Sequence, residues 1–153
     1  MAQASQSSNP SAPQPIPSGG TGSGNGKFLI IGVAPDLVDF TDPTIPKGLT
    51  PADIQKGLEA AQADIAAIGA SASLCMITNN PLESNALIQG CLTNSTYEGI
   101  IIGNAIRSGL KSFSLFEMVM NIVNRKAPNS KIGFNQSPKD SAEVAKRIAA
   151  KFY

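Results

Sequence analysis

The side chains that could bind a ligand in this chain are carboxylates, amides and one arginine, and most of them follow apolar segments. Such groups orient a small molecule through hydrogen bonds, and an arginine adds a permanent positive charge. The sequence therefore predicts a site for a small anionic or polar metabolite. The candidate residues are Asp36, Asp39, Asn104, Arg107, Glu117, Asn121 and Asn135.

Arg107 is the candidate that turn chemistry explains least. Asn, Ser and Asp are also the residues that turns and helix N-caps require. A loop arginine has no such role, so we expect Arg107 to bind an anionic group or to pair with a surface acid. Glu117 has a structural alternative as the third helical residue of a capping box that begins at Ser114. Asn121 and Asn124 extend a polar stripe that could face the site, a partner subunit or solvent.

A metal site is a weaker interpretation of the acidic residues. Asp36, Asp39 and Asp42 recur at a spacing of three, and carboxylate oxygens are ligands for hard cations such as Mg²⁺. Asp42 precedes a proline, however, and this pair is typical of the start of a turn. We therefore expect a solvated loop and predict no metal.

The residues that several kinds of catalysis require are absent from this chain. There is no His, so a His-based triad or His metal ligand is excluded. The first apolar segment continues as Gly32-Val33-Ala34-Pro35, which is not a dinucleotide-binding G-x-G-x-x-G motif. Cys75 and Cys91 are predicted to be small buried apolar side chains, because no His is present to activate a thiolate. The sequence names no cofactor and leaves open whether the protein is an enzyme.

Charge and composition limit the partners and divide the chain in two. With 12 basic and 11 acidic residues, the chain lacks the basic excess of a nucleic-acid-binding protein. No apolar run reaches the length that spans a membrane. Residues 1–26 are uncharged and rich in Ser, Gly and Pro, which predicts a disordered tail or a Pro-rich docking segment. Without a secretory or mitochondrial signal, residues 27–153 are predicted to form a single soluble, cytoplasmic α/β domain.

The elements that must position the candidates alternate between strand and helix four times. Three helices are expected to begin with an N-cap residue, a proline and then an acid two residues later, as in Thr50-Pro51-Ala52-Asp53. A fourth helix is expected to follow Ser114. The predicted strands are residues 28–33, 73–78, 99–102 and 131–134.

This alternation predicts a doubly wound, four-stranded parallel sheet in a three-layer α/β sandwich. A flavodoxin-like strand order 2-1-3-4 is favoured, and a Rossmann-like order 3-2-1-4 is the alternative. Ligands of such sheets bind beyond the carboxyl ends of the strands, where the strand order reverses. The first order places the site between loops 34–49 and 103–112, and the second moves it toward residues 135–137.

Part of the chain resembles a known group of proteins. The relevant segments are Gly32-Val33-Ala34-Pro35-Asp36, Ile102-Gly103-Asn104-Ala105-Ile106-Arg107, Leu115-Phe116-Glu117 and Ile132-Gly133-Phe134-Asn135. They are similar to a group of small uncharacterised bacterial and fungal α/β proteins with a pattern I-G-x-G-x-R, L-F-E, A-P and F-N-x-x-P-x-D. Ala105 stands where that group has a second glycine. The resemblance implies the fold and no particular activity.

Two functions follow as expectations. The first is binding of a small molecule at the carboxyl edge of the sheet, with Arg107 on an anionic group. The second is a non-enzymatic interaction module, such as a homodimer, with the N-terminal tail as a tether.

Overall fold

The computed structural model describes residues 26–108 and 113–150. These residues form one four-stranded parallel sheet, whose strand order is β2-β1-β3-β4. The prediction of a doubly wound α/β fold with the order 2-1-3-4 is confirmed, and the order 3-2-1-4 is wrong. The tail expected over residues 1–26 lies outside the described residues except for Gly26. The strands are β1 (Lys27–Val33), β2 (Ser71–Ile77), β3 (Gly99–Ile102) and β4 (Lys131–Phe134).

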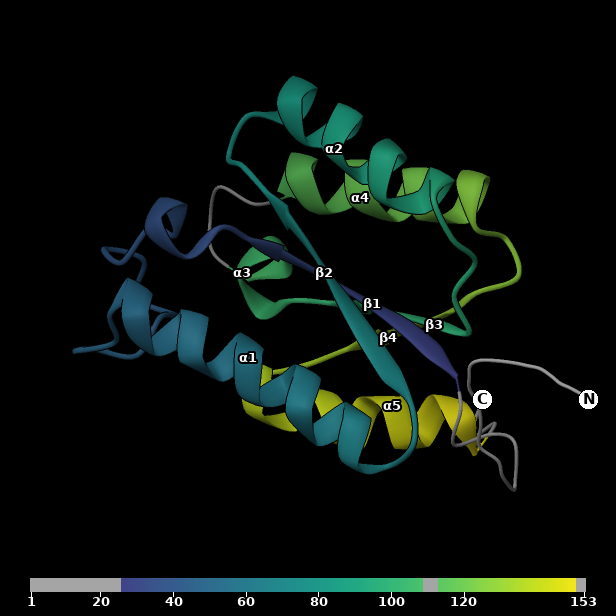
Figure 1. Cartoon of the computed structure of the whole chain (residues 1–153). Helices are drawn as coiled ribbons and strands as arrows, with labels where there is room; N and C mark the ends of the chain where they lie inside the picture. Colours follow the sequence, from purple (N-terminus) through teal and green to yellow (C-terminus); the bar gives the residue numbers. More distant parts are fainter. Residues whose placement is uncertain (1–25, 109–112, 151–153) are drawn as a thin grey trace, which may run out of the picture.

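Helices cover both faces of the sheet (Figure 1). One face carries the first and last long helices, and the other carries the two helices between them, so two separate clusters of buried apolar side chains form. The face with α1 and α5 buries Phe28, Ile30 and Ile101, and the face with α2 and α4 buries Leu29, Ile31 and Ile100. The helices are α1 (Pro51–Ala67), α2 (Pro81–Thr93), α3 (Asn104–Arg107), α4 (Phe113–Lys126) and α5 (Ser141–Ala149), and the 3₁₀ helices are η2 (Pro35–Leu37) and η3 (Pro138–Asp140).

The first helix begins as the sequence predicts. The Thr50 hydroxyl accepts a hydrogen bond from the Asp53 N–H at 3.1 Å, and the Asp53 carboxylate accepts one from the Thr50 N–H at 3.0 Å. This reciprocal pair satisfies two of the N–H groups that a helix start leaves free. At the other end Gly69 adopts φ +85°, a left-handed conformation that glycine reaches without a Cβ clash.

The structure differs from the sequence prediction at three helix starts. The loop expected after β3 contains the short helix α3. Helix α4 begins at Phe113, so Ser114 lies inside its first turn and is not its N-cap. The capping box of Ser137 and Asp140 exists, but it opens η3, and α5 begins only at Ser141. Each difference concerns the local route of the chain, whereas the order of long elements is as expected.

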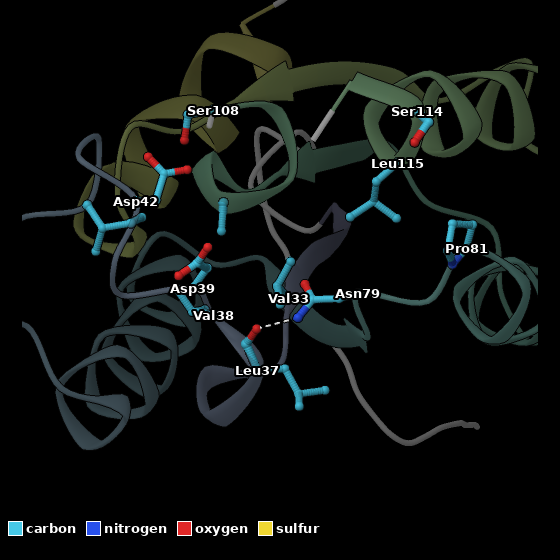
Figure 2. A pocket seen from close by; sticks show the side chains of 12 residues that line it. Val33, Leu37, Val38, Asp39, Asp42, Asn79, Pro81, Ser108, Ser114 and Leu115 are labelled. Atoms are coloured by element: carbon cyan, nitrogen blue, oxygen red, sulfur yellow. Dashed lines mark hydrogen bonds between the residues drawn. The ribbon is translucent and has the colours of Figure 1, made fainter. Parts of the chain in front are cut away.

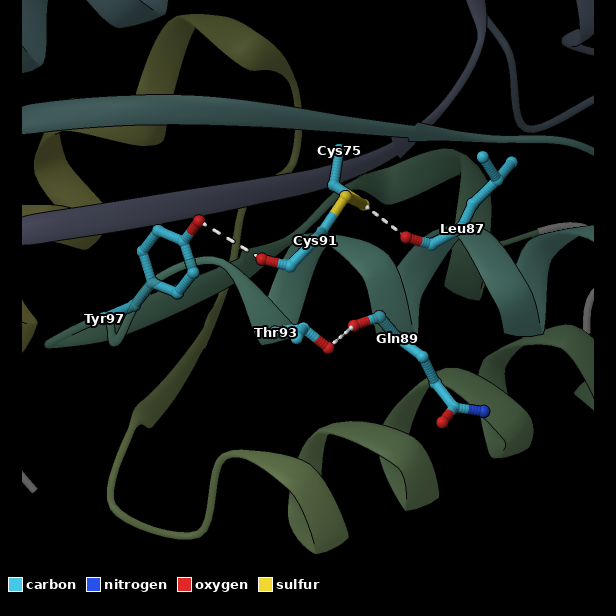
Figure 3. The surroundings of a disulfide bond; sticks show 6 residues. All are labelled: Cys75, Leu87, Gln89, Cys91, Thr93 and Tyr97. Atoms are coloured by element: carbon cyan, nitrogen blue, oxygen red, sulfur yellow. Dashed lines mark hydrogen bonds between the residues drawn. A yellow bond between two sulfur atoms is a disulfide. The ribbon is translucent and has the colours of Figure 1, made fainter.

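The two cysteines form a disulfide bond, which corrects their prediction as unlinked apolar side chains. Cys75 lies in β2 and Cys91 in α2, with Cα atoms 6.2 Å apart, and the bond joins the sheet to the helix that packs on it (Figure 3). Cys75 is buried as expected. Next to this bond, the Tyr97 hydroxyl donates a hydrogen bond to the Cys91 carbonyl at 3.4 Å.

Among the described residues, none of the helices is both long enough and apolar enough to cross a membrane.

Candidate functional site

Two neighbouring cavities lie at the carboxyl edge of the sheet, over β1 and β3. This is the position that the strand order predicts for a ligand. The cavities share the side chains of Val33, Val38, Ile45 and Ala105 as walls. We call them the acidic cavity, on the side of α2 and α4, and the amide cavity, on the side of α1 and α5.

The acidic cavity has a volume of about 440 Å³ and carries two carboxylates in its wall (Figure 2). Both carboxylates already serve the turns of the loop after β1. Asp39 accepts from the Thr41 N–H at 3.0 Å, and Asp42 accepts from the Thr44 N–H at 2.8 Å. The third predicted acid, Asp36, is exposed in η2 and lines neither cavity. Within the described part of the chain, no three acidic or cysteine side chains are grouped to hold a metal ion.

The amide cavity has a volume of about 380 Å³ and a predominantly apolar wall. Its apolar wall comes from β1, from the loop after β1 and from one face of α1, where Ile54 and Leu58 point toward the sheet cluster. Its polar wall comes from the turns after β3 and β4 and includes Asn104 and Asn135. The charged residues in this wall are Asp53 and Lys139.

Asn135 joins three elements at the floor of the amide cavity. Its N–H donates to the Ile102 carbonyl of β3 at 3.4 Å, and its Nδ2 donates to the Ser141 hydroxyl of α5 at 3.1 Å. Its main-chain carbonyl accepts a hydrogen bond from Arg107. Asn135 is only 2% exposed, yet its Oδ1 has no hydrogen-bond partner among the described residues. A buried acceptor of this kind is rare in native proteins and calls for a partner.

Arg107 binds its own chain instead of opening into either cavity. Nη2 donates to the Asn135 carbonyl, and the guanidinium lies over the Phe134 ring at 5.5 Å from its centroid. The described residues give Arg107 no ion pair, and its buried Nε has no hydrogen-bond partner. Arg107 therefore holds the turn after β3 against the turn after β4. Its side chain lines neither cavity, so it contacts the cavities through the residues that it positions.

Glu117 and Asn121 lie away from both cavities. They are exposed on α4, and Asn121 Nδ2 donates to the Glu117 carbonyl one turn earlier at 2.8 Å. The capping-box role expected for Glu117 is wrong, because α4 begins before Ser114. Of the seven predicted residues, the structure brings Asn104, Asn135 and the positioning residue Arg107 together at one cavity and places Asp39 at the other.

The residues that the sequence reasoning missed are on α1. Gly57 lies in the middle of this helix and in the wall of the amide cavity, and a Cβ atom there would lie 3.2 Å from Cβ of Pro138. A glycine is unfavourable inside a helix by roughly 0.5–1 kcal/mol relative to alanine. A glycine inside a predicted helix was therefore the sequence feature that could have pointed to this site. It indicates a position where the helix backbone approaches another segment closely.

The wall of the amide cavity contains one carboxylate whose ionisation is perturbed. Hydrogen bonds from the backbone and then the side chain of Thr50 lower the pKa of Asp53 below its ordinary value of 3.8. Because the pKa of this carboxyl is lower in the folded state than in the unfolded state, its ionised form stabilises the fold. This stabilisation is fully present when the pH is above the pKa of the unfolded state, and it is lost as the pH falls through the pKa of the folded state.

Asp53→Asn is therefore expected to be less stable than the wild type near neutral pH. The difference should disappear when the pH falls well below 3.8, where Asp53 is protonated in both states. Urea unfolding of both proteins across this pH range checks it. Asp64→Asn, which removes an exposed acid farther along α1, is the control. A difference between wild type and Asp53→Asn that persists at acid pH would contradict the capping mechanism.

No protein-family model and no curated protein matches the chain, so the function has to be argued from the geometry of the site.

Proposed function

We propose that the protein binds a small molecule in the amide cavity, with an apolar body and an uncharged polar edge. The apolar body fits between α1 and the loop after β1, and the polar edge lies against Asn104 and Asn135. Cavities of this kind, apolar with a few polar groups that fix orientation, are the usual form of small-molecule sites.

The observation that carries the proposal is Asn135, a residue in the wall of this cavity whose buried Oδ1 has no hydrogen-bond partner among the described residues. A buried acceptor without a partner costs about 1–3 kcal/mol. Exchanging the two ends of the amide would pair Oδ1 with the Ser141 hydroxyl and leave Nδ2 unpaired instead. In either orientation one amide atom lacks a partner, which a ligand with an amide-like edge supplies.

An uncharged ligand fits better than the anionic one that the sequence suggested first. Arg107, the expected anion ligand, is held by the Asn135 carbonyl and the Phe134 ring. The neighbouring acidic cavity carries Asp39 and Asp42, and their negative charges oppose an anion at this edge of the sheet. Among the described residues that line the two cavities, Lys139 of the amide cavity is the only basic one.

A thermal-shift screen tests the proposal. The panel pairs neutral planar compounds, such as nucleosides and riboflavin, with their phosphorylated forms. A ligand at about 100 times its dissociation constant adds roughly 2.7 kcal/mol, a shift of several degrees for a domain of this size. We expect shifts from neutral members of the panel that their phosphorylated forms do not exceed.

Two glycine substitutions then locate the site. Gly57→Leu places a side chain in the amide cavity and should abolish the ligand-induced shift. Gly90→Leu makes the same change in the last turn of α2, where no other described segment lies within 4 Å of a Cβ atom, and should retain it. A shift that survives Gly57→Leu places the ligand elsewhere. A stronger shift with phosphorylated compounds restores the anionic alternative.

A further inference from the structure

The outer edge of β2 is an unpaired strand edge within the described part of the sheet. In β2 the Ser71 N–H donates to the Gly26 carbonyl and the Ile77 carbonyl accepts from the Ala34 N–H, so both residues turn their backbone groups toward β1. Because backbone groups alternate along a strand, Ser73 and Cys75 do the same. Ala72, Leu74 and Met76 therefore direct their N–H and C=O groups away from the sheet.

These outward groups have few partners inside the chain. Gln62 of α1 donates a side-chain hydrogen bond to the Ala72 carbonyl at 2.9 Å. Among the described residues, no strand pairs with the other outward groups, because β2 ends the sheet on this side. Ser71 and Ser73 are exposed beside them, and Leu74 and Met76 are half-buried.

The β2 edge also lacks the features that keep strand edges apart. Charged side chains, prolines and short length are the usual protections of an exposed edge. No charged residue occurs between Asp64 and Glu83, and β2 is seven residues long without a proline. The opposite edge strand, β4, is protected in both respects, since it has four residues and begins with Lys131. This contrast indicates that the edge of β2, and not that of β4, is suited to pairing with a further strand.

We infer that β2 pairs with β2 of a second copy of this chain, antiparallel and about a two-fold axis at Leu74. In this register Leu74 lies opposite Leu74 of the partner subunit, and Ala72 lies opposite Met76 of the partner subunit. Each pair consists of residues with outward backbone groups, so both members exchange hydrogen bonds. Self-pairing suits the strand because identical uncharged segments meet without like-charge repulsion. The two sheets become one continuous sheet.

The pairing does not depend on ligand binding, because the β2 edge lies apart from both cavities and no residue of β2 lines either of them. The Cys75–Cys91 disulfide anchors β2 to α2 and keeps the strand in place.

Sedimentation equilibrium of the full chain over a range of concentrations tests the inference. The wild type should show a monomer–dimer equilibrium. Ala72→Pro removes an outward N–H that the pairing with β1 does not use, and Ser73→Lys adds a charge to the exposed edge. Each should weaken the dimer by about tenfold or more. Asn129→Lys adds the same charge to an exposed turn next to β4 and should leave the dimer unchanged.

Amide hydrogen exchange followed by NMR distinguishes pairing of the β2 edge with a second copy from pairing with a segment of the same chain. In the dimer the N–H groups of Ala72, Leu74 and Met76 should become protected as concentration rises, while those of Ser73 and Cys75 are protected at every concentration. A protein that is monomeric throughout overturns the inference, as does a dimer that Ala72→Pro and Ser73→Lys leave intact while circular dichroism shows them folded. Protection of the outward amides in a protein that sediments as a monomer assigns the edge to a segment of the same chain and also overturns it.

Discussion

Removing the cross-link between β2 and α2 is expected to lower the free energy of unfolding by about 3 kcal/mol. Cys75 and Cys91 are separated by 16 positions, and closing a loop of about that size in the unfolded chain accounts for a change of this order. The double variant Cys75→Ala/Cys91→Ala should melt on the order of 10 °C below the wild type. Calorimetry or urea unfolding measures both quantities.

Reductant provides the control for the disulfide prediction. Treatment with dithiothreitol should bring the wild type close to the stability of the double variant, whereas the double variant should not respond. Because Cys75 is 1% exposed, part of the loss in the variant comes from the missing sulfur atom, and the reduced wild type keeps that atom. A wild type with two titratable thiols and the same stability with and without reductant would contradict the prediction.

The disulfide also bears on where the protein works. Disulfides persist in oxidising compartments and are rare in reducing ones. The cytoplasmic location suggested by the sequence therefore competes with an oxidising environment, and thiol titration of the protein as isolated from its cells distinguishes them. The sequence reasoning treated each cysteine alone, since nothing local shows that a residue of the edge strand faces one in the following helix.

The parts of the fold that could be predicted are those encoded by neighbouring residues. The capping box at Thr50 and Asp53 lies within a single turn of helix, and the run from Phe28 to Val33 shows by its composition that both faces of β1 are covered. Strand order is different, because each pairing joins distant segments. The sequence left two orders open, and only the pairings of β1 with both β2 and β3 distinguish them.

The position of the two cavities was predictable, whereas the residues in their walls were less so. The switch-point rule places it over β1 and β3, and both cavities lie there. The role of Arg107 depends on a backbone carbonyl 28 residues away, which no local pattern reveals. Glu117 and Asn121 lie in the predicted helix, α4, but on its exposed side. Ile54 and Leu58 of α1 pack toward the sheet, and the same side of α1 also closes a cavity.

Asn135→Leu is expected to weaken binding in the amide cavity by about tenfold or more, the effect of losing one buried hydrogen bond to a ligand. Leucine has a similar size and keeps the wall closed, but it has no polar edge to offer. The same substitution leaves the buried Ser141 hydroxyl without its Asn135 partner, while the removal of the unpaired Oδ1 offsets part of that cost, so stability should fall by up to about 1–2 kcal/mol. Calorimetric titration with a compound from the screen and urea unfolding separate the two effects.

The double variant Asn135→Leu/Ser141→Ala decides whether the loss of binding is a loss of structure. Removing both members of a buried hydrogen bond is often nearly neutral, whereas removing one leaves the other unsatisfied. The double variant should therefore recover most of the stability lost in Asn135→Leu and should still fail to bind. Ser141→Ala alone keeps the Asn135 amide and should bind the compound. If binding returned together with stability in the double variant, Asn135 would be a structural link between β3 and α5, and its unpaired oxygen would have no part in recognition.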